Sequence, residues 1–109
     1  MATYFRNATF KDIGTTKQTV LDNTNNSKLT VIGISLANVS ESNLFVDVTV
    51  TDSTDTEVFY LKQVPLPPNS SLRAINGGEK LILANDNQLA VKSNLAASVD
   101  CIVSYVEIL

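Results

Sequence analysis

Residues 44–64 read LFVDVTVT-DSTD-TEVFYLKQV, two strand-like runs that flank a short polar turn. In the first run, from Leu44 to Thr51, apolar residues alternate with polar ones, which is typical of a strand with one face on a core and the other in water. The second run, from Thr56 to Val64, is rich in the aromatic and β-branched residues that favour strands. Because the residues from Asp52 to Asp55 bond readily to their own backbone and favour a turn, we predict an antiparallel β-hairpin.

The same period of two continues on both sides of this hairpin. The run from Lys28 to Asn38 has apolar residues on both faces, which predicts a strand buried on both sides, with Ile32, Ile34 and Leu36 on one face and Leu29 and Val31 on the other. The last run, from Ser98 to Leu109, is long enough to cross the whole domain, and we expect it at the centre of a sheet. Shorter strands are predicted at residues 4–10, 13–21, 71–75, 80–84 and 88–92.

Proline and glycine mark the connections. Three prolines between Pro65 and Ser71 remove backbone donors, so this segment is predicted to cross from one sheet to another. The tripeptide Asn76-Gly77-Gly78 predicts a tight hairpin turn. No long window has the 3.6-residue period of a helix. Eight or nine short strands with frequent turns therefore predict an all-β fold, a two-layer antiparallel β-sandwich in which residues 1–109 form one domain, with jelly-roll connectivity as one candidate topology.

Composition and charge argue against several classes of function. The net charge is −3 and the eight basic residues are scattered along the chain, which argues against a nucleic-acid partner. No apolar run reaches 18 residues, and the first residues lack the layout of a signal peptide, so we expect neither a membrane span nor Sec export. The chain has no histidine, which removes Ser-His, Cys-His and His-metal chemistry from a single chain. We expect no enzymatic activity and no cofactor.

Two sets of carboxylates could form a chemical site. The acidic residues near the predicted hairpin end are Asp47, Asp52, Asp55 and Glu57. They could bind Ca²⁺, but we prefer to interpret them as a solvated turn because their spacing is not that of an EF-hand. A glycosidase needs two acids about 5 to 10 Å apart across a cleft, and the candidates Asp86, Asp100 and Glu107 lie in a turn and in a terminal strand. Cys101 alternates with valines on an apolar face, which predicts a buried, inert thiol.

Three aromatic residues near the N-terminus are the candidate subunit-contact residues. Tyr4, Phe5 and Phe10 lie where strand pairing is hard to predict from the sequence. Aromatic side chains of this kind can anchor a chain in a neighbouring subunit. The alternative is that they close one end of the core, and the sequence leaves both interpretations open.

Strand and turn segments along nearly the whole chain resemble small virion structural proteins of tailed bacteriophages, especially cyanophages. The segments are residues 29–40 (LTVIGISLANVS), 46–52 (VDVTVTD), 60–67 (YLKQVPLP), 71–72 (SL), 78–83 (GEKLIL) and 104–108 (SYVEI), with NAT, IGTT and TVL as a similar opening at 7–9, 13–16 and 19–21. Two turns depart from that pattern: Glu41 stands where the pattern has glycine, and Asn85-Asp86 stands where it has Gly-Asp.

The resemblance implies a β-sandwich that attaches to a phage particle. It implies a capsid decoration (cement) protein, commonly a homotrimer, that contacts itself and the major capsid protein in a virion assembled in the host cytoplasm. A tail or fibre component is the alternative within the same class. A host-glycan-binding module is a third interpretation, with little support from a chain that has three tyrosines and no tryptophan.

Overall fold

The computed structural model describes residues 2–24 and 26–109, without the side chains of residues 76–79. Within these ranges the chain forms strands and connecting loops, and no helix. The strands are β1 (Thr3–Ile13), β2 (Gln18–Asp22), β3 (Lys28–Asn38), β4 (Leu44–Thr51), β5 (Glu57–Leu66), β6 (Ser71–Leu83), β7 (Gln88–Ser93) and β8 (Val99–Ile108). Across the described residues, we find no helical segment with the length and apolar character needed to cross a membrane.

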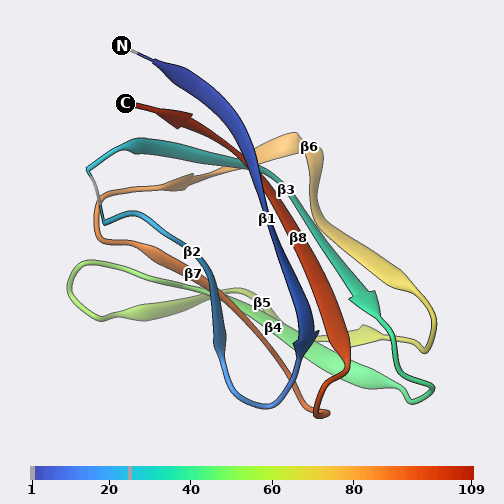
Figure 1. Ribbon diagram of the computed structural model, residues 1–109. Helices are drawn as coiled ribbons and strands as arrows, with labels where there is room; N and C mark the ends of the chain where they lie inside the picture. The colour runs from blue at the N-terminus through green and yellow to red at the C-terminus, as the bar shows by residue number, and fades with distance from the viewer. Residues whose placement is uncertain (1, 25) are drawn as a thin grey trace.

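The strands form two four-stranded sheets that pack face to face. One sheet has the order β1-β8-β3-β6 and the other β2-β7-β4-β5, and every pair is antiparallel. Figure 1 shows the two layers, with both chain ends at one end of the first sheet. Strands pair as β1 with β8, β2 with β7, β3 with β6 and β4 with β5, so the chain is a long antiparallel ribbon rolled upon itself. This is jelly-roll connectivity, and the predicted two-layer β-sandwich is confirmed.

The core lies between the sheets and consists almost entirely of aliphatic side chains. The predicted hairpin contributes as expected, since Leu44, Val46 and Val48 are fully buried and β4 pairs with β5. Strand β8 lies between β1 and β3, which confirms its predicted central place. The other members of the buried hydrophobic cluster are Ile13, Val20, Leu29, Val31, Ile34, Leu36, Leu66, Ile75, Leu83, Leu89, Val91, Val99, Cys101 and Val103.

A β-bulge in β3 corrects the prediction that this strand is buried on both faces. Leu29 and Val31 are buried before the bulge, and Ile34 and Leu36 are buried after it. The pairing with β8 shifts between Val31 and Gly33, so Ile32 is one extra residue on β3. An extra residue reverses the alternation of inward and outward side chains. Both sets of aliphatic residues therefore face the same core, and the opposite face of β3 is the outer surface of the sheet.

A second bulge corrects the N-terminal prediction, in which Ile13 begins a new strand. Ile13 is instead the last residue of β1, opposite Val99, and is buried. The register shifts between Phe10 and Ile13, where Asp12 has a φ of 57° and its N–H donates to Asp100 Oδ1 at 3.0 Å. An aspartate tolerates this left-handed conformation better than most residues. The bulge turns Ile13 inward, and the next strand starts only at Gln18.

The predicted hairpin turn at Asn76-Gly77-Gly78 is wrong. Strand β6 runs through these residues, and both of its halves pair with β3 in the same antiparallel direction. Asn76 is opposite Gly33 and Leu81 is opposite Val31, so between these two pairs β6 has four residues, 77–80, where β3 has only Ile32. Glycines in a strand often mark such irregular pairing rather than a reversal. By contrast, the proline-rich crossover is confirmed, because β5 is an edge strand of one sheet and β6 belongs to the other.

The two turns that depart from the phage pattern do not need glycine at the departing residue. Asn85, which stands where the pattern has glycine, is not among the residues with positive φ; the φ of 64° belongs to Asp86, where the pattern also has aspartate. Glu41 is absent from the residues with positive φ, so its backbone does not require a glycine.

Two buried asparagines close opposite ends of the sandwich. Asn23 Nδ2 donates to the carbonyl oxygens of Ser27, at 2.7 Å, and Leu83, at 2.9 Å. Asn38 Nδ2 donates in the same manner to Ser42 and Leu66, both at 2.9 Å. Each asparagine thus ties its own loop to the last residue of a strand that is distant in sequence. Because buried carbonyl groups must be hydrogen-bonded, these amides satisfy strand ends that the sheets leave open.

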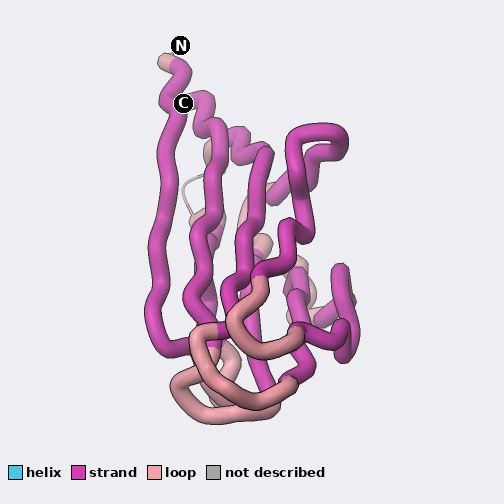
Figure 2. Tube along the Cα trace, turned by 90° about the vertical axis from the view of Figure 1, so that its right-hand side faces the viewer, coloured by secondary structure: helices cyan, strands magenta, loops and turns pink. Residues whose placement is uncertain are grey.

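The loops that contain residues 14–17, 39–43 and 94–98 gather at the lower end of the molecule in Figure 2. Backbone hydrogen bonds join them: Ser93 N–H donates to Gly14 O at 3.0 Å, and Val39 N–H donates to Ser98 O at 2.9 Å. A Cβ atom added at Gly14 would lie 2.9 Å from Ala97 N and 3.1 Å from Ala96 Cα. The loop therefore packs on the backbone of Gly14 directly.

Replacing Gly14 and Gly33 by alanine, one at a time, should distinguish a glycine needed for close packing from one that lies in an ordinary strand. We expect Gly14→Ala to lower the free energy of unfolding by about 1–3 kcal/mol, because the new methyl group meets rigid backbone. Gly33→Ala has no neighbour closer than 3.7 Å and should change stability by less than about 1 kcal/mol, in the stabilising direction. Urea unfolding of both variants measures the difference. Equal stability of the two variants would contradict the packing of the 94–98 loop on Gly14.

Candidate docking face

The three predicted contact aromatics all lie on β1, an edge strand of the first sheet, but they face different surroundings. Phe10 packs against the core. Tyr4 is 40% exposed and Phe5 is 82% exposed. Of the two interpretations that the sequence leaves open, Phe10 fits the one in which aromatics close the core, whereas Tyr4 and Phe5 are available for contact.

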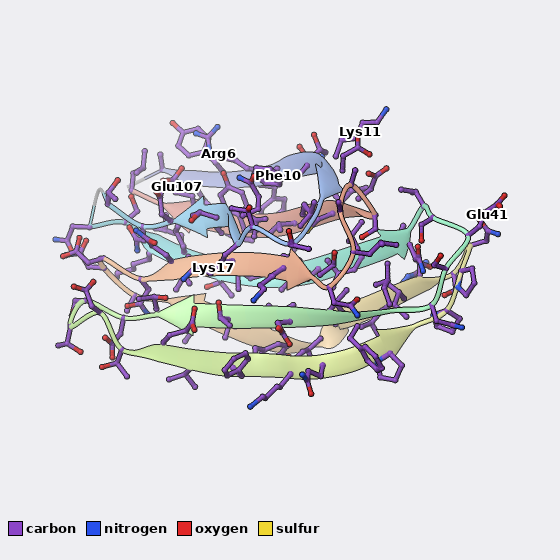
Figure 3. All side chains as sticks on the ribbon, turned by 90° about the horizontal axis from the view of Figure 1, so that it is seen from below. Arg6, Phe10, Lys11, Lys17, Glu41 and Glu107 are labelled. Carbon is purple, nitrogen blue, oxygen red and sulfur yellow. The ribbon has the colours of Figure 1, made fainter. Side chains whose placement is uncertain are left out.

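Tyr4 belongs to a small polar cluster at the joined chain ends. The Arg6 guanidinium lies 4.6 Å from the centre of the Tyr4 ring, and Arg6 Nε donates to Glu107 Oε1 at 3.0 Å. Figure 3 shows Arg6 and Glu107 on neighbouring strands at the same end of the sheet. A guanidinium over an aromatic ring is an attractive arrangement, so Arg6 holds the exposed ring in place.

Phe5 begins a row of side chains across the outer face of the same sheet that is apolar except at Thr30. Residues directly opposite each other in antiparallel strands share a face. Phe5 is opposite Val106, Val106 is opposite Thr30, and Thr30 is opposite Ile82. Ile102 lies on the same face of β8, four residues before Val106. We call Phe5, Ile82, Ile102 and Val106 the outer-face patch.

The outer-face patch is largely open to solvent. Besides Phe5, Ile82 is 72% exposed and Ile102 is 48% exposed. A shallow hollow of about 640 Å³ adjoins Phe5, with Ile32 and Ser104 in its lining. Thr30 separates Val106 from Ile82, and Ser104 separates Ile102 from Val106. Exposed apolar side chains gathered on one face commonly mark protein–protein contacts.

Sequence reasoning found Phe5 but missed the isoleucines of the patch. Ile102 and Val106 alternate with the buried valines of β8, a pattern that also fits a strand buried on both faces. Ile82 becomes recognisable only when the pairing of β6 with β3 is known. One feature of the sequence could have indicated these outward-facing residues: the strands contain more aliphatic residues than a single core-facing side can hold.

The carboxylates considered for Ca²⁺ do not converge on one point. Asp52 Oδ1 accepts hydrogen bonds from Thr54 N, Thr54 Oγ1 and Thr56 N at 2.6–3.0 Å, within the β4–β5 turn. The Thr54 hydroxyl, with the Thr56 and Thr54 amides, lowers the pKa of Asp52. Asp47 Oδ1 accepts the Gln63 N–H at 2.7 Å, halfway along the hairpin. Over the described residues, no three acidic or cysteine side chains form a group that could hold a metal ion.

The carboxylates considered for glycosidase chemistry are also apart. Asp100 and Glu107 are at opposite ends of β8, and seven residues of strand span about 23 Å. That separation is more than twice the distance that two catalytic acids need. Asp86 lies in the turn that follows β6.

Comparisons with known proteins concern the fold. No protein-family model matches the chain, and no curated protein matches its sequence. Among solved structures, a chain of the Bacillus endospore appendages, which are disulfide-linked pili, has a TM-score of 0.60 at 8% identity. The alignment covers 97% of this chain and 85% of that chain.

Two further similar structures come from viral particles. A chain in the acid-stable capsid of Helicobacter pylori bacteriophage KHP30 has a TM-score of 0.53 at 13% identity, covering 100% of this chain and 89% of that chain. A chain of the IBDV viral particle has a TM-score of 0.52 at 10% identity, covering 96% of this chain and 35% of that chain. At such low identities the likeness shows a shared fold. That fold, an antiparallel β-sandwich, is found in proteins of capsids and of a pilus, which fits the expected class of virion structural β-proteins.

Cys101 should behave as an inert thiol. It is buried in the core, and burial raises its pKa to about 12. Because burial favours the neutral thiol, roughly a thousandfold less thiolate is present at pH 8 than for an ordinary cysteine. We expect Ellman's reagent to label Cys101 slowly in native buffer and rapidly in guanidinium chloride. Comparable labelling rates in the two solutions would show that the thiol is accessible in the folded state.

Proposed function

We propose that this protein is a non-enzymatic structural component of a bacteriophage particle, a capsid decoration (cement) protein that binds the major capsid protein as a homotrimer. The outer-face patch carries the proposal, because it presents apolar side chains that a protein neighbour would cover. Tyr4 and Phe5 are assigned to the contact between copies. Phe10 packs against the core and holds β1 on the sandwich. The fold shared with chains of viral particles supports a place in the virion, following assembly in the host cytoplasm.

The edge strands support assembly as well. β1 is an edge strand of eleven residues, and its outer edge has no strand partner within the described chain. Open edges invite pairing with another chain, and closed cyclic assemblies are one way to cover them. A trimer that buries Phe5 would place β1 beside a second copy.

A tail or fibre component is the second candidate within the same class. Copy number in purified particles separates the two. We expect quantitative mass spectrometry to find the protein in numbers comparable with the major capsid protein. Far smaller numbers would favour the tail, and absence from particles would reject both.

A substitution in the outer-face patch should dissociate the oligomer without unfolding the chain. We expect wild-type protein to sediment at three times its chain mass of 11.8 kDa, and Phe5→Ser to sediment as a monomer. Because Phe5 is 82% exposed, the change removes little buried area within one chain. Sedimentation velocity and thermal unfolding measure the two effects.

Phe45→Ser is the matched control. Phe45 is 49% exposed on the other sheet, so its substitution should leave the trimer intact. A stable wild-type monomer, or equal dissociation by both variants, would overturn the assignment of Phe5 to the contact.

A further inference from the structure

The outer face of the second sheet carries a polar site around Thr49. Thr49 is opposite Ala90 on β7 and Phe59 on β5, and it points away from the core valines of β4. Its side chain is nevertheless only 5% exposed, and its Oγ1 has no hydrogen-bond partner among the described residues. A buried hydroxyl without a partner is unusual in a native protein.

An ion pair explains why Thr49 is covered. Lys17 Nζ donates to Glu57 Oε2 at 2.9 Å. Lys17 precedes β2 and Glu57 begins β5, which are the two edge strands of this sheet, so the pair spans β7 and β4. Figure 3 shows Lys17 over this face. Lys17 lowers the pKa of Glu57, and the nearby Thr49 hydroxyl adds a smaller effect without meeting ordinary hydrogen-bond geometry.

The ion pair, Thr49 and their neighbours line a partly open cavity of about 230 Å³. Asp47 and Lys92, directly opposite each other on β4 and β7, line one side. Phe59, 44% exposed, lines another. The cavity is smaller than the roughly 300–1,000 Å³ of sites for drug-sized ligands, so it suits a single ring.

The lining selects a class of ligand. Two ammonium groups and two carboxylates surround the cavity, so an anion would meet Asp47 and Glu57 and a cation would meet Lys17 and Lys92. A neutral molecule with several hydroxyl groups avoids this conflict, since each hydroxyl can donate to a carboxylate and accept from an ammonium group. The Lys62 ammonium group lies 5.1 Å from the centre of the Phe59 ring, and the part of the ring that Lys62 leaves open offers an apolar surface for the C–H face of a sugar.

We propose that this cavity binds one neutral sugar residue, with Phe59 stacking on the ring. The solvent-exposed Lys17–Glu57 pair, which covers Thr49 Oγ1, opens on binding so that Thr49 Oγ1 bonds to a sugar hydroxyl. The site is separate from the outer-face patch, which lies on the other sheet. The test of sugar binding is therefore independent of the test of the proposed place in the virion.

Saturation-transfer difference NMR on the full chain tests the proposal, with D-glucose, D-galactose, D-mannose and N-acetyl-D-glucosamine as neutral probes. Glucuronic acid and glucosamine are the charged probes. We expect signal transfer to the ring protons of at least one neutral sugar, and weaker transfer to both charged sugars. No transfer to any neutral sugar, or stronger transfer to a charged one, would overturn the assignment.

Substitutions locate the binding. Phe59→Leu keeps an apolar side chain but removes the ring, and we expect it to weaken binding about tenfold. Thr49→Val keeps the shape of the side chain and removes the hydroxyl, and we expect a loss of about fivefold. Phe45→Leu, on the same face of β4 but outside the cavity lining, is the matched control and should bind as wild type. If Phe45→Leu weakens binding as much as Phe59→Leu does, the sugar binds elsewhere.

Discussion

The β-bulge at Ile32 determines how the central part of the first sheet faces the core. β3 pairs with β8 on one side and β6 on the other, and both pairings shift between Val31 and Gly33. Without the extra residue, either Leu29 and Val31 or Ile34 and Leu36 would face water, since alternation in a strand has a strict period of two. The bulge thus makes a continuous aliphatic surface on one face. It also leaves the other face free for the outer-face patch.

The rolled-ribbon topology then sets what each surface can do. Both sheets cover one core, so each has an outer face that the chain itself does not cover. On β1-β8-β3-β6 that face carries exposed apolar side chains among polar ones, with Phe5 and Ile82 among the most exposed large side chains described. On β2-β7-β4-β5 the corresponding face is crossed by the Lys17–Glu57 ion pair. Because the faces differ in chemistry, the two proposals concern different partners, a protein surface and a sugar.

Local sequence signals succeeded where alternation was unbroken. Leu44, Val46 and Val48 follow a clean period of two, and the polar turn after them has the residues that such turns need. The prediction was wrong at two places. Ile13 follows a bulge at the end of β1 instead of starting a strand, and Asn76-Gly77-Gly78 lies in an irregularly paired part of β6 instead of a hairpin turn. A glycine pair is compatible with either structure, and the pairing partner decides between them.

By itself, the sequence determined the all-β class, the crossover at the prolines, the central place of the last strand and the burial of Cys101, because each depends on residues close together in the chain. Tertiary structure decided the phase of each strand, since bulges are recognised only when a partner strand sets the register. It also decided which apolar residues lie outside, and it brought Lys17 and Glu57, forty residues apart, together over Thr49. Such contacts depend on how distant strands are aligned, and no local pattern of residue types encodes that alignment.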